Sequence, residues 1–115
     1  MINKGLTMYN CCICGNETTQ LHEVIFGSAN QKICVDYNLQ VPLCATHHDT
    51  AHGKKHKPVN CEYDCMSQSQ CYTTFCEKLG IDPFKTFRAV KNKTERCYLD
   101  TISGSCLNII KGYEI

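Results

Sequence analysis

The sequence predicts an α+β fold in which short strands and a short helix carry clustered metal ligands and further helices follow. Two apolar stretches, at 21–26 and 41–43, predict strands. Cysteine and histidine pairs flank these stretches at the spacing of metal ligands. Beyond residue 60, apolar side chains recur with helical periodicity. A chain of 115 residues has room for one domain, 1–115, with a modest core.

The connection between the two predicted strands opens with the turn-rich residues 27–30, and we expect Asn30 and Asn38 to serve turns. After the second strand, the segment 45–52 is short, polar and rich in histidine. We interpret it as a helix that ends at Gly53, because glycine commonly ends helices.

A second, core-facing helix is predicted after residue 60. Its apolar stripe has helical spacing and consists of Cys61, Cys65, Tyr72, Phe75, Cys76 and Leu79. Gly80 should end this helix. We therefore divide the domain into a zinc knuckle with a strand–helix core, a helical extension and an unassigned tail, at 9–53, 60–99 and 100–115.

A shorter helix should follow Gly80. Asp82 offers an N-cap and Pro83 suits the first turn. We expect this helix to bury Phe84 and Phe87. Residues 101–115 contain apolar side chains without a decisive period, so they are compatible with either a strand or a loosely held tail.

Charge is distributed unevenly along the chain, although the formal net charge is only +1. Nine of the twelve basic residues fall between positions 54 and 96, namely Lys54, Lys55, Lys57, Lys78, Lys85, Arg88, Lys91, Lys93 and Arg96. A basic second half is suited to phosphate contacts, and it also fits an ordinary solvated helix face.

Eleven cysteines in so short a chain would suit a disulfide-rich secreted domain. Three features favour a reducing cytoplasm instead: the odd count, a first segment without an apolar signal core, and the interleaving of cysteine with histidine. No apolar run approaches the roughly 20 residues of a membrane-spanning helix, so we expect no membrane partner.

Two ligand pairs predict a structural zinc site. Cys11 and Cys14 form a C-x-x-C pair, and Cys44 with His47 forms a C-x-x-H pair. Each spacing lets two ligands converge on one ion, and together they supply a tetrahedral set. Cys12 could in principle replace Cys11, but the spacing favours Cys11. Such an ion contributes to folding and takes no part in catalysis.

A second set of histidines predicts an open metal site. His48 and His52 are four residues apart, so on a helix they point to nearly the same side, whereas His47 lies about 100° around the axis from His48. The strand that contains His22 is the nearest candidate to pack over that face. Three imidazoles leave coordination positions open, as a catalytic metal requires.

The remaining cysteines give weaker signals. A second zinc site could form from Cys61, Cys65, Cys71, Cys76 and His56, but the spacing is irregular and the helical stripe already explains three of the cysteines. We expect Cys34, Cys97 and Cys106 to be packing residues.

Four segments of the chain resemble the HNH (His-Me finger) endonuclease family, particularly its small phage and prophage members. They are Cys11-x-x-Cys14, the run from Leu21 to Gly27, the run from Val41 to His48, and His52 with Gly53. The resemblance covers residues 9–53 closely and 54–99 loosely. It implies a ββα-metal fold around one divalent ion, such as Mg²⁺ or Mn²⁺, and hydrolysis of phosphodiester bonds in nucleic acid, with DNA as the expected partner.

By this resemblance, His22, His48 and His52 fall on the metal ligands, and Glu23 falls where the family has the histidine that activates water. Glutamate is the weaker base of the two unless its site is dry. Either Glu23 is the base, or His22 is the base and the ion has fewer ligands. A third outcome is a zinc-stapled nucleic-acid-binding module with impaired catalysis, and a fourth is a thiol-rich metal buffer.

Overall fold

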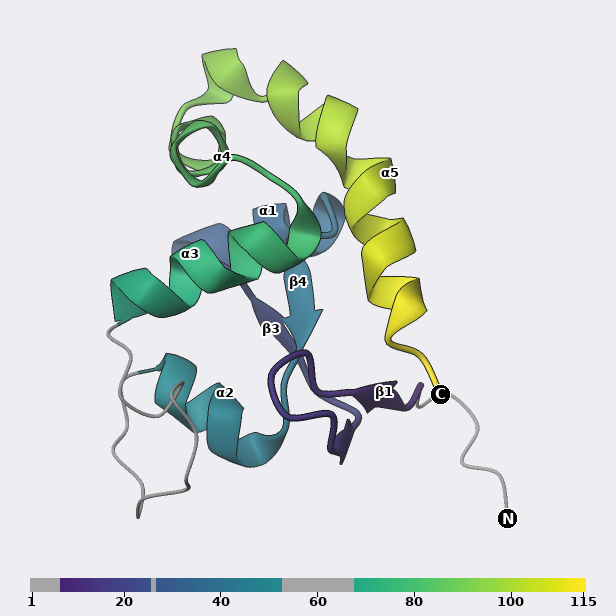
Figure 1. Ribbon diagram of the computed structural model, residues 1–115. Coiled ribbons are helices and arrows are strands. Elements are labelled where there is room, and N and C mark those ends of the chain that lie inside the picture. Colours follow the sequence, from purple (N-terminus) through teal and green to yellow (C-terminus); the bar gives the residue numbers. More distant parts are fainter. Residues whose placement is uncertain (1–6, 26, 53–67) are drawn as a thin grey trace.

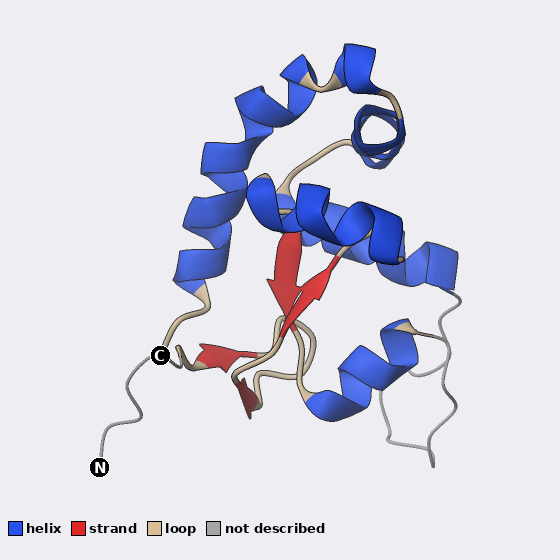
Figure 2. Cartoon of the chain, turned by 180° about the vertical axis from the view of Figure 1, so that it is seen from behind, coloured by secondary structure: helices blue, strands red, loops and turns tan. Residues whose placement is uncertain are grey.

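The computed structural model describes residues 7–25, 27–52 and 68–115 and has an α+β architecture. Within these ranges it contains five α-helices and two small antiparallel sheets (Figure 1). One sheet pairs β1 (Tyr9–Asn10) with β2 (Glu17–Thr18), and the other pairs β3 (Leu21–Glu23) with β4 (Gln40–Pro42). Seen from behind in Figure 2, helices surround the β3–β4 pair, and the β1–β2 pair lies near the C-terminus.

The β3–β4 pair confirms the two predicted strands, although β3 is shorter than expected and β4 begins and ends one residue earlier than expected. His22 lies opposite Val41 in the register, and the chain bends at Val24 and Ile25. Val41 is fully buried, and His22 is 2% exposed on the same face of the sheet. Because paired residues of adjacent strands project to one side, the register places His22 toward the core.

The connection between these strands contains a helix that the sequence analysis did not predict, α1 (Ser28–Asp36). Asn30 is buried within it, so its expected role in a turn is wrong. Asn38 does occupy a turn, with a φ of 61°, and its amide donates to the Ser103 carbonyl oxygen at 3.2 Å. Asparagine tolerates this left-handed conformation better than most residues.

The predicted histidine-rich helix is present as α2 (Ala45–Ala51), and Gly53, its expected end, lies outside the described residues. The core-facing helix is α3 (Gln68–Leu79), in which Phe75, Cys76 and Leu79 are buried. Gly80 follows with a φ of 69°, a conformation that glycine adopts without strain. Cys61 and Cys65 lie outside the described residues.

The shorter helix is α4 (Pro83–Lys91), and Asp82 caps it by accepting a hydrogen bond from the Lys85 N–H at 2.8 Å. The expectation that Phe84 and Phe87 are buried is wrong, because they are 78% and 48% exposed. The helix packs through a different face, which carries its buried residues Thr86, Ala89 and Val90. Bulk alone therefore did not indicate which face of this helix is buried.

The expected strand or loose tail at 101–115 is instead part of α5 (Cys97–Gly112), which follows the short 3₁₀ turn η2 (Lys93–Glu95). Leu99, Cys106 and Ile110 are its buried residues. After the helix, the N–H of Ile115 donates to the Met8 carbonyl oxygen at 2.9 Å. This contact joins the two ends of the described chain beside β1 (Figure 1).

The core lies between the β3–β4 pair and helices α3 and α5. Its largest fully buried aliphatic and aromatic side chains are Phe75, Leu39, Leu43, Leu79, Leu99, Val41 and Val90. Cys34 and Cys106 are fully buried, as expected of packing residues, but Cys97 is exposed at the start of α5, which corrects that expectation. No helix in the described ranges has the length and apolar character needed to cross a bilayer.

Candidate metal centres

Four predicted zinc ligands gather at the start of α2. Cys11 and Cys14 lie in the turn between β1 and β2, Cys44 is the N-cap residue of α2, and His47 lies in its first turn. One ligand atom from each residue lies within 4.8 Å of the others. The four residues are thus close enough to share one ion.

The turn that holds the first two cysteines is shaped by backbone hydrogen bonds. The Cys11 N–H donates to the Asn16 carbonyl at 2.7 Å, and the Gly15 N–H donates to the Cys11 carbonyl at 2.9 Å. Gly15 has a φ of 80°, and a Cβ placed there would meet no atom within 4 Å. Backbone conformation, and not lack of space, therefore explains why glycine follows the second cysteine.

The distances within this cluster match a tetrahedral zinc site. Bonds of about 2.3 Å to sulfur and 2.0–2.1 Å to nitrogen give about 3.8 Å between two sulfurs and about 3.5 Å between sulfur and nitrogen. The Sγ atoms of Cys14 and Cys44 are 3.7 Å apart. The Nδ1 atom of His47 is 3.7 Å from the Sγ of Cys11 and 3.3 Å from that of Cys44. The cluster is consistent with a structural zinc.

The thiols of Cys11 and its neighbour Cys12 have pKa values shifted in opposite directions. Burial raises the pKa of Cys11, but nearby backbone hydrogen bonds outweigh burial and hold the pKa of this thiol below its ordinary value. Burial, reinforced by the charge of Cys11, raises the pKa of Cys12 to about 12. Burial likewise raises the pKa of Cys14 to about 11, so the choice of Cys11 over Cys12 rests on geometry: the ligand group contains Cys11 and not Cys12.

The second group consists of His22 from β3, His48 from α2 and His52, the C-cap residue of α2, and their ligand atoms also lie within 4.8 Å of one another. The ring of His22 is centred 5.1 Å from each of the other two rings. The Nε2 atoms of His48 and His52 are 3.1 Å apart. Two nitrogens bound to one ion at about 2.1 Å would be about 3.0–3.4 Å apart, so the spacing fits a shared ion.

Gln20, which the sequence analysis did not identify, orients the ring of His48. Its Oε1 accepts a hydrogen bond from Nδ1 of His48 at 2.9 Å. This contact leaves the Nε2 lone pair of His48 directed at the cluster, as in metal sites where a second hydrogen bond selects the tautomer. The Gln20 backbone is itself held, because its N–H donates to Thr18 Oγ1 and its carbonyl accepts from Leu43.

His22 occupies the buried side of the group. Burial, followed by repulsion from His48 and His52, lowers its pKa to about 3, so the imidazole is neutral at physiological pH. Its Nδ1 is buried without a hydrogen-bond partner in the described part of the chain. A neutral, buried nitrogen of this kind fits a metal ligand, because a bound ion would compensate for the missing hydrogen bond.

Glu23 lies beside the histidine group but is not among the residues whose ligand atoms cluster. It lines a cavity of about 290 Å³ together with His22, His52 and residues from the start of α1. One carboxylate and two imidazoles therefore line the same cavity.

The two clusters share one short helix. His47 points toward the cysteines and is 2% exposed, whereas the next residue, His48, points toward β3. Adjacent side chains on a helix diverge by about 100°, and this divergence separates the two groups. Of the residues considered for a further zinc site, Cys61, Cys65 and His56 lie outside the described residues.

Comparison of the chain with protein-family models, curated proteins and solved structures finds no match.

Proposed function

We propose that the protein is a metal-dependent endonuclease of the HNH type, which hydrolyses phosphodiester bonds of nucleic acid, with DNA as the expected substrate. The observation that carries this proposal is the group of three histidines beside a cavity that also contains a carboxylate. The proposal is supported by the place of the ligands on β3 and at α2, in a chain order of β3, α1, β4 and α2 with β3 paired to β4.

In this proposal, His22, His48 and His52 hold a divalent ion, and Gln20 keeps His48 in the correct tautomer. When bound, the ion supplies stabilisation of the negative charge that develops on the phosphate and the leaving oxygen. The histidine group supplies neutral ligands, and the cavity beside it admits the phosphate group.

Glu23 is assigned as the general base, because His22 serves as a ligand of the ion in this arrangement. The Glu23 carboxylate accepts a proton from water as the water oxygen attacks phosphorus. The bond between phosphorus and the leaving oxygen breaks, and that oxygen acquires a proton from solvent. Basic residues of the helical half hold the phosphate backbone without reading its sequence.

The Cys₃His cluster has a structural part in this proposal. A zinc ion there joins the β1–β2 turn to the first turn of α2, which also carries His48. Holding the N-terminus of α2 therefore keeps His48 and His52 aligned with β3. A catalytic ion at the three histidines and a structural ion at the cysteines would thus depend on one helix.

A binding module that has lost the chemistry is the second candidate, and the presence of glutamate at position 23 favours it. In that case the zinc-stapled domain would still bind nucleic acid through its basic residues. A protein of this kind would retain affinity for DNA but would not cut it with any divalent ion.

Plasmid nicking distinguishes the two functions. We expect purified protein to convert supercoiled plasmid to open circles when Mg²⁺, Mn²⁺ or Ni²⁺ is added. His48→Ala should lose at least about a hundredfold in rate, because it removes both a ligand and its link to Gln20. Thr46→Ser, on the same helix and outside both clusters, serves as the matched control.

Circular dichroism on each variant separates loss of activity from loss of folding. Nicking by His48→Ala at the wild-type rate would reject the assignment and indicate a contaminating nuclease. Binding of the plasmid by wild type without nicking in any of the three ions would support the binding module instead.

A further inference from the structure

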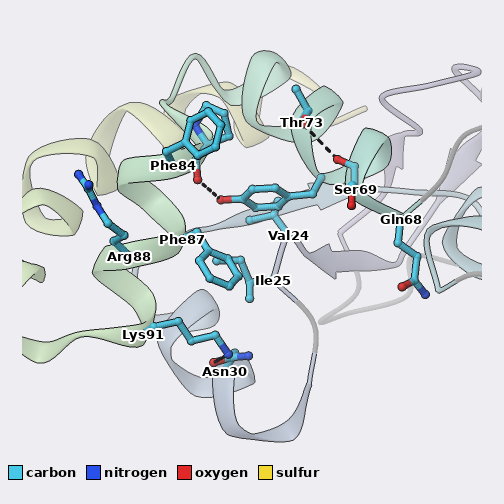
Figure 3. A pocket seen from close by; sticks show the side chains of 12 residues that line it. Val24, Ile25, Asn30, Gln68, Ser69, Thr73, Phe84, Phe87, Arg88 and Lys91 are labelled. Carbon is cyan, nitrogen blue, oxygen red and sulfur yellow. Dashed lines mark hydrogen bonds between the residues drawn. The ribbon is translucent and has the colours of Figure 1, made fainter.

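A second, larger cavity lies between α1, α3 and α4, next to the bend that follows β3. It has a volume of about 790 Å³ (Figure 3). Its walls are mainly apolar, and they are formed by Val24, Ile25, Tyr72, Pro83, Phe84 and Phe87. A volume of this size is typical of sites for small ligands.

Aromatic side chains dominate one wall of this cavity. Phe84 and Phe87 project from α4 and are 78% and 48% exposed. Figure 3 shows the ring of Phe87 next to Ile25. The ring of Tyr72 lies 6.4 Å from that of Phe87 and is held by a 2.7 Å hydrogen bond from its hydroxyl to the Pro83 carbonyl. The wall therefore presents aromatic surface, in which the Tyr72 ring is held in position.

Cationic groups border the same wall. Lys91 places its Nζ 5.6 Å from the centre of the Phe87 ring and 3.3 Å from Oδ1 of Asn30. Arg88 also lines the cavity, and its charge is partly balanced by Glu95 at 3.6 Å. None of the described residues that line the cavity is acidic. The preferred occupant thus combines a flat apolar ring with negative charge.

We propose that this cavity binds an unpaired nucleobase of a single-stranded or locally opened nucleic acid. A base inside a duplex has both faces stacked and offers only its edges, whereas an unpaired base can stack on an aromatic side chain. Lys91 and Arg88 are placed to contact the flanking phosphates. The choice of nucleic acid as the ligand rests on the proposed endonuclease function.

The position of the cavity along the chain supports this inference. Val24, on its wall, directly follows Glu23, which lines the smaller cavity beside the histidines. Their Cα atoms are therefore about 3.8 Å apart. A strand whose base occupies the larger cavity can place a neighbouring phosphate close to the histidine group.

Fluorescence anisotropy tests the proposal in the His48→Ala background without added divalent ion, so that cleavage does not interfere. The probes are a labelled single strand, its duplex and an abasic strand of equal length. We expect the single strand to bind most tightly, and Phe84→Ala with Phe87→Ala to weaken its binding about tenfold or more. Val35→Ala, an exposed apolar residue of α1 outside the cavity, is the control and should bind as before.

Equal binding of the abasic and normal strands, or unchanged binding by the double variant, would overturn the proposal. If the double variant instead abolishes self-association of the protein and leaves oligonucleotide binding intact, the cavity belongs to a second copy of the chain. Base-dependent binding in a protein that never nicks plasmid would keep this inference and reject the endonuclease. Nicking together with base-independent binding would keep the endonuclease and reject the base-binding cavity.

Discussion

Removal of the ion expected at the Cys₃His cluster should unfold the protein. Structural zinc binding is worth roughly 10–16 kcal/mol in zinc-finger peptides, whereas the whole stability of a typical domain is about 5–15 kcal/mol. The ion would join Cys11 and Cys14 to the start of α2, so its loss would remove a link between two parts of a small core. We therefore expect a strong chelator to abolish the cooperative thermal transition followed by circular dichroism.

Cysteine variants locate this effect. Cys44→Ser should reproduce the loss of folding, because serine is a poor zinc ligand and Cys44 lies at the N-cap of α2. Cys97→Ser is the matched control, since Cys97 is exposed and lies outside both clusters. If Cys44→Ser melts within about 2 °C of wild type, the cluster does not support the fold.

Replacement of Glu23 by glutamine should reduce the rate of metal-dependent nicking by about 10²–10⁴-fold, the usual contribution of a general base. The amide keeps the size of the side chain but no longer accepts a proton from water. Because Glu23 is outside the histidine group, the variant should still bind the divalent ion. A rate assay under saturating metal, combined with ion counting, measures the two effects separately.

Glu17→Gln is the control for this prediction. Glu17 is exposed on β2, and its replacement removes the same charge from the chain. Wild-type nicking by Glu23→Gln would transfer the role of base to His22, the alternative that the sequence leaves open. The ion would then retain only His48 and His52 from the group.

The ligand pairs were predictable because each is local in the sequence. The C-x-x-C, C-x-x-H and i, i+4 spacings depend only on a turn or one helix, so they can be recognised without the fold. To predict that residues far apart in the sequence, such as His22 and His48, lie together, the strand and helix assignments also had to be correct. Those assignments were correct in type, although β3 is shorter than predicted and β4 is shifted by one residue.

Other elements gave weaker signals. Helix α1 begins after Gly27 without a side-chain cap and follows turn-forming residues, so its start resembles a loop. Helix α5 contains Ser103, Gly104 and Ser105, which have low or moderate helix propensity, and its burial depends on packing against distant elements. In both cases tertiary contacts outweigh local preference.

Side-chain placement was the least predictable feature. Phe84 and Phe87 have the bulk of core residues, but the buried face of α4 is formed by smaller side chains. Gln20 has no spacing or motif that marks it, because its contact with His48 arises only when β3 and α2 come together. Hydrogen bonds of this kind, between a candidate ligand and a residue that is not a ligand, can be identified only in the folded structure.

Counting ions by native mass spectrometry is the most direct test of two metal centres on one helix. Wild-type protein equilibrated with zinc and then manganese should hold two ions per chain, one tightly bound zinc and one exchangeable ion. His48→Ala should keep the zinc and lose the exchangeable ion. A single ion in wild type, or release of the zinc by His48→Ala, would contradict the separation of His47 and His48 between two sites.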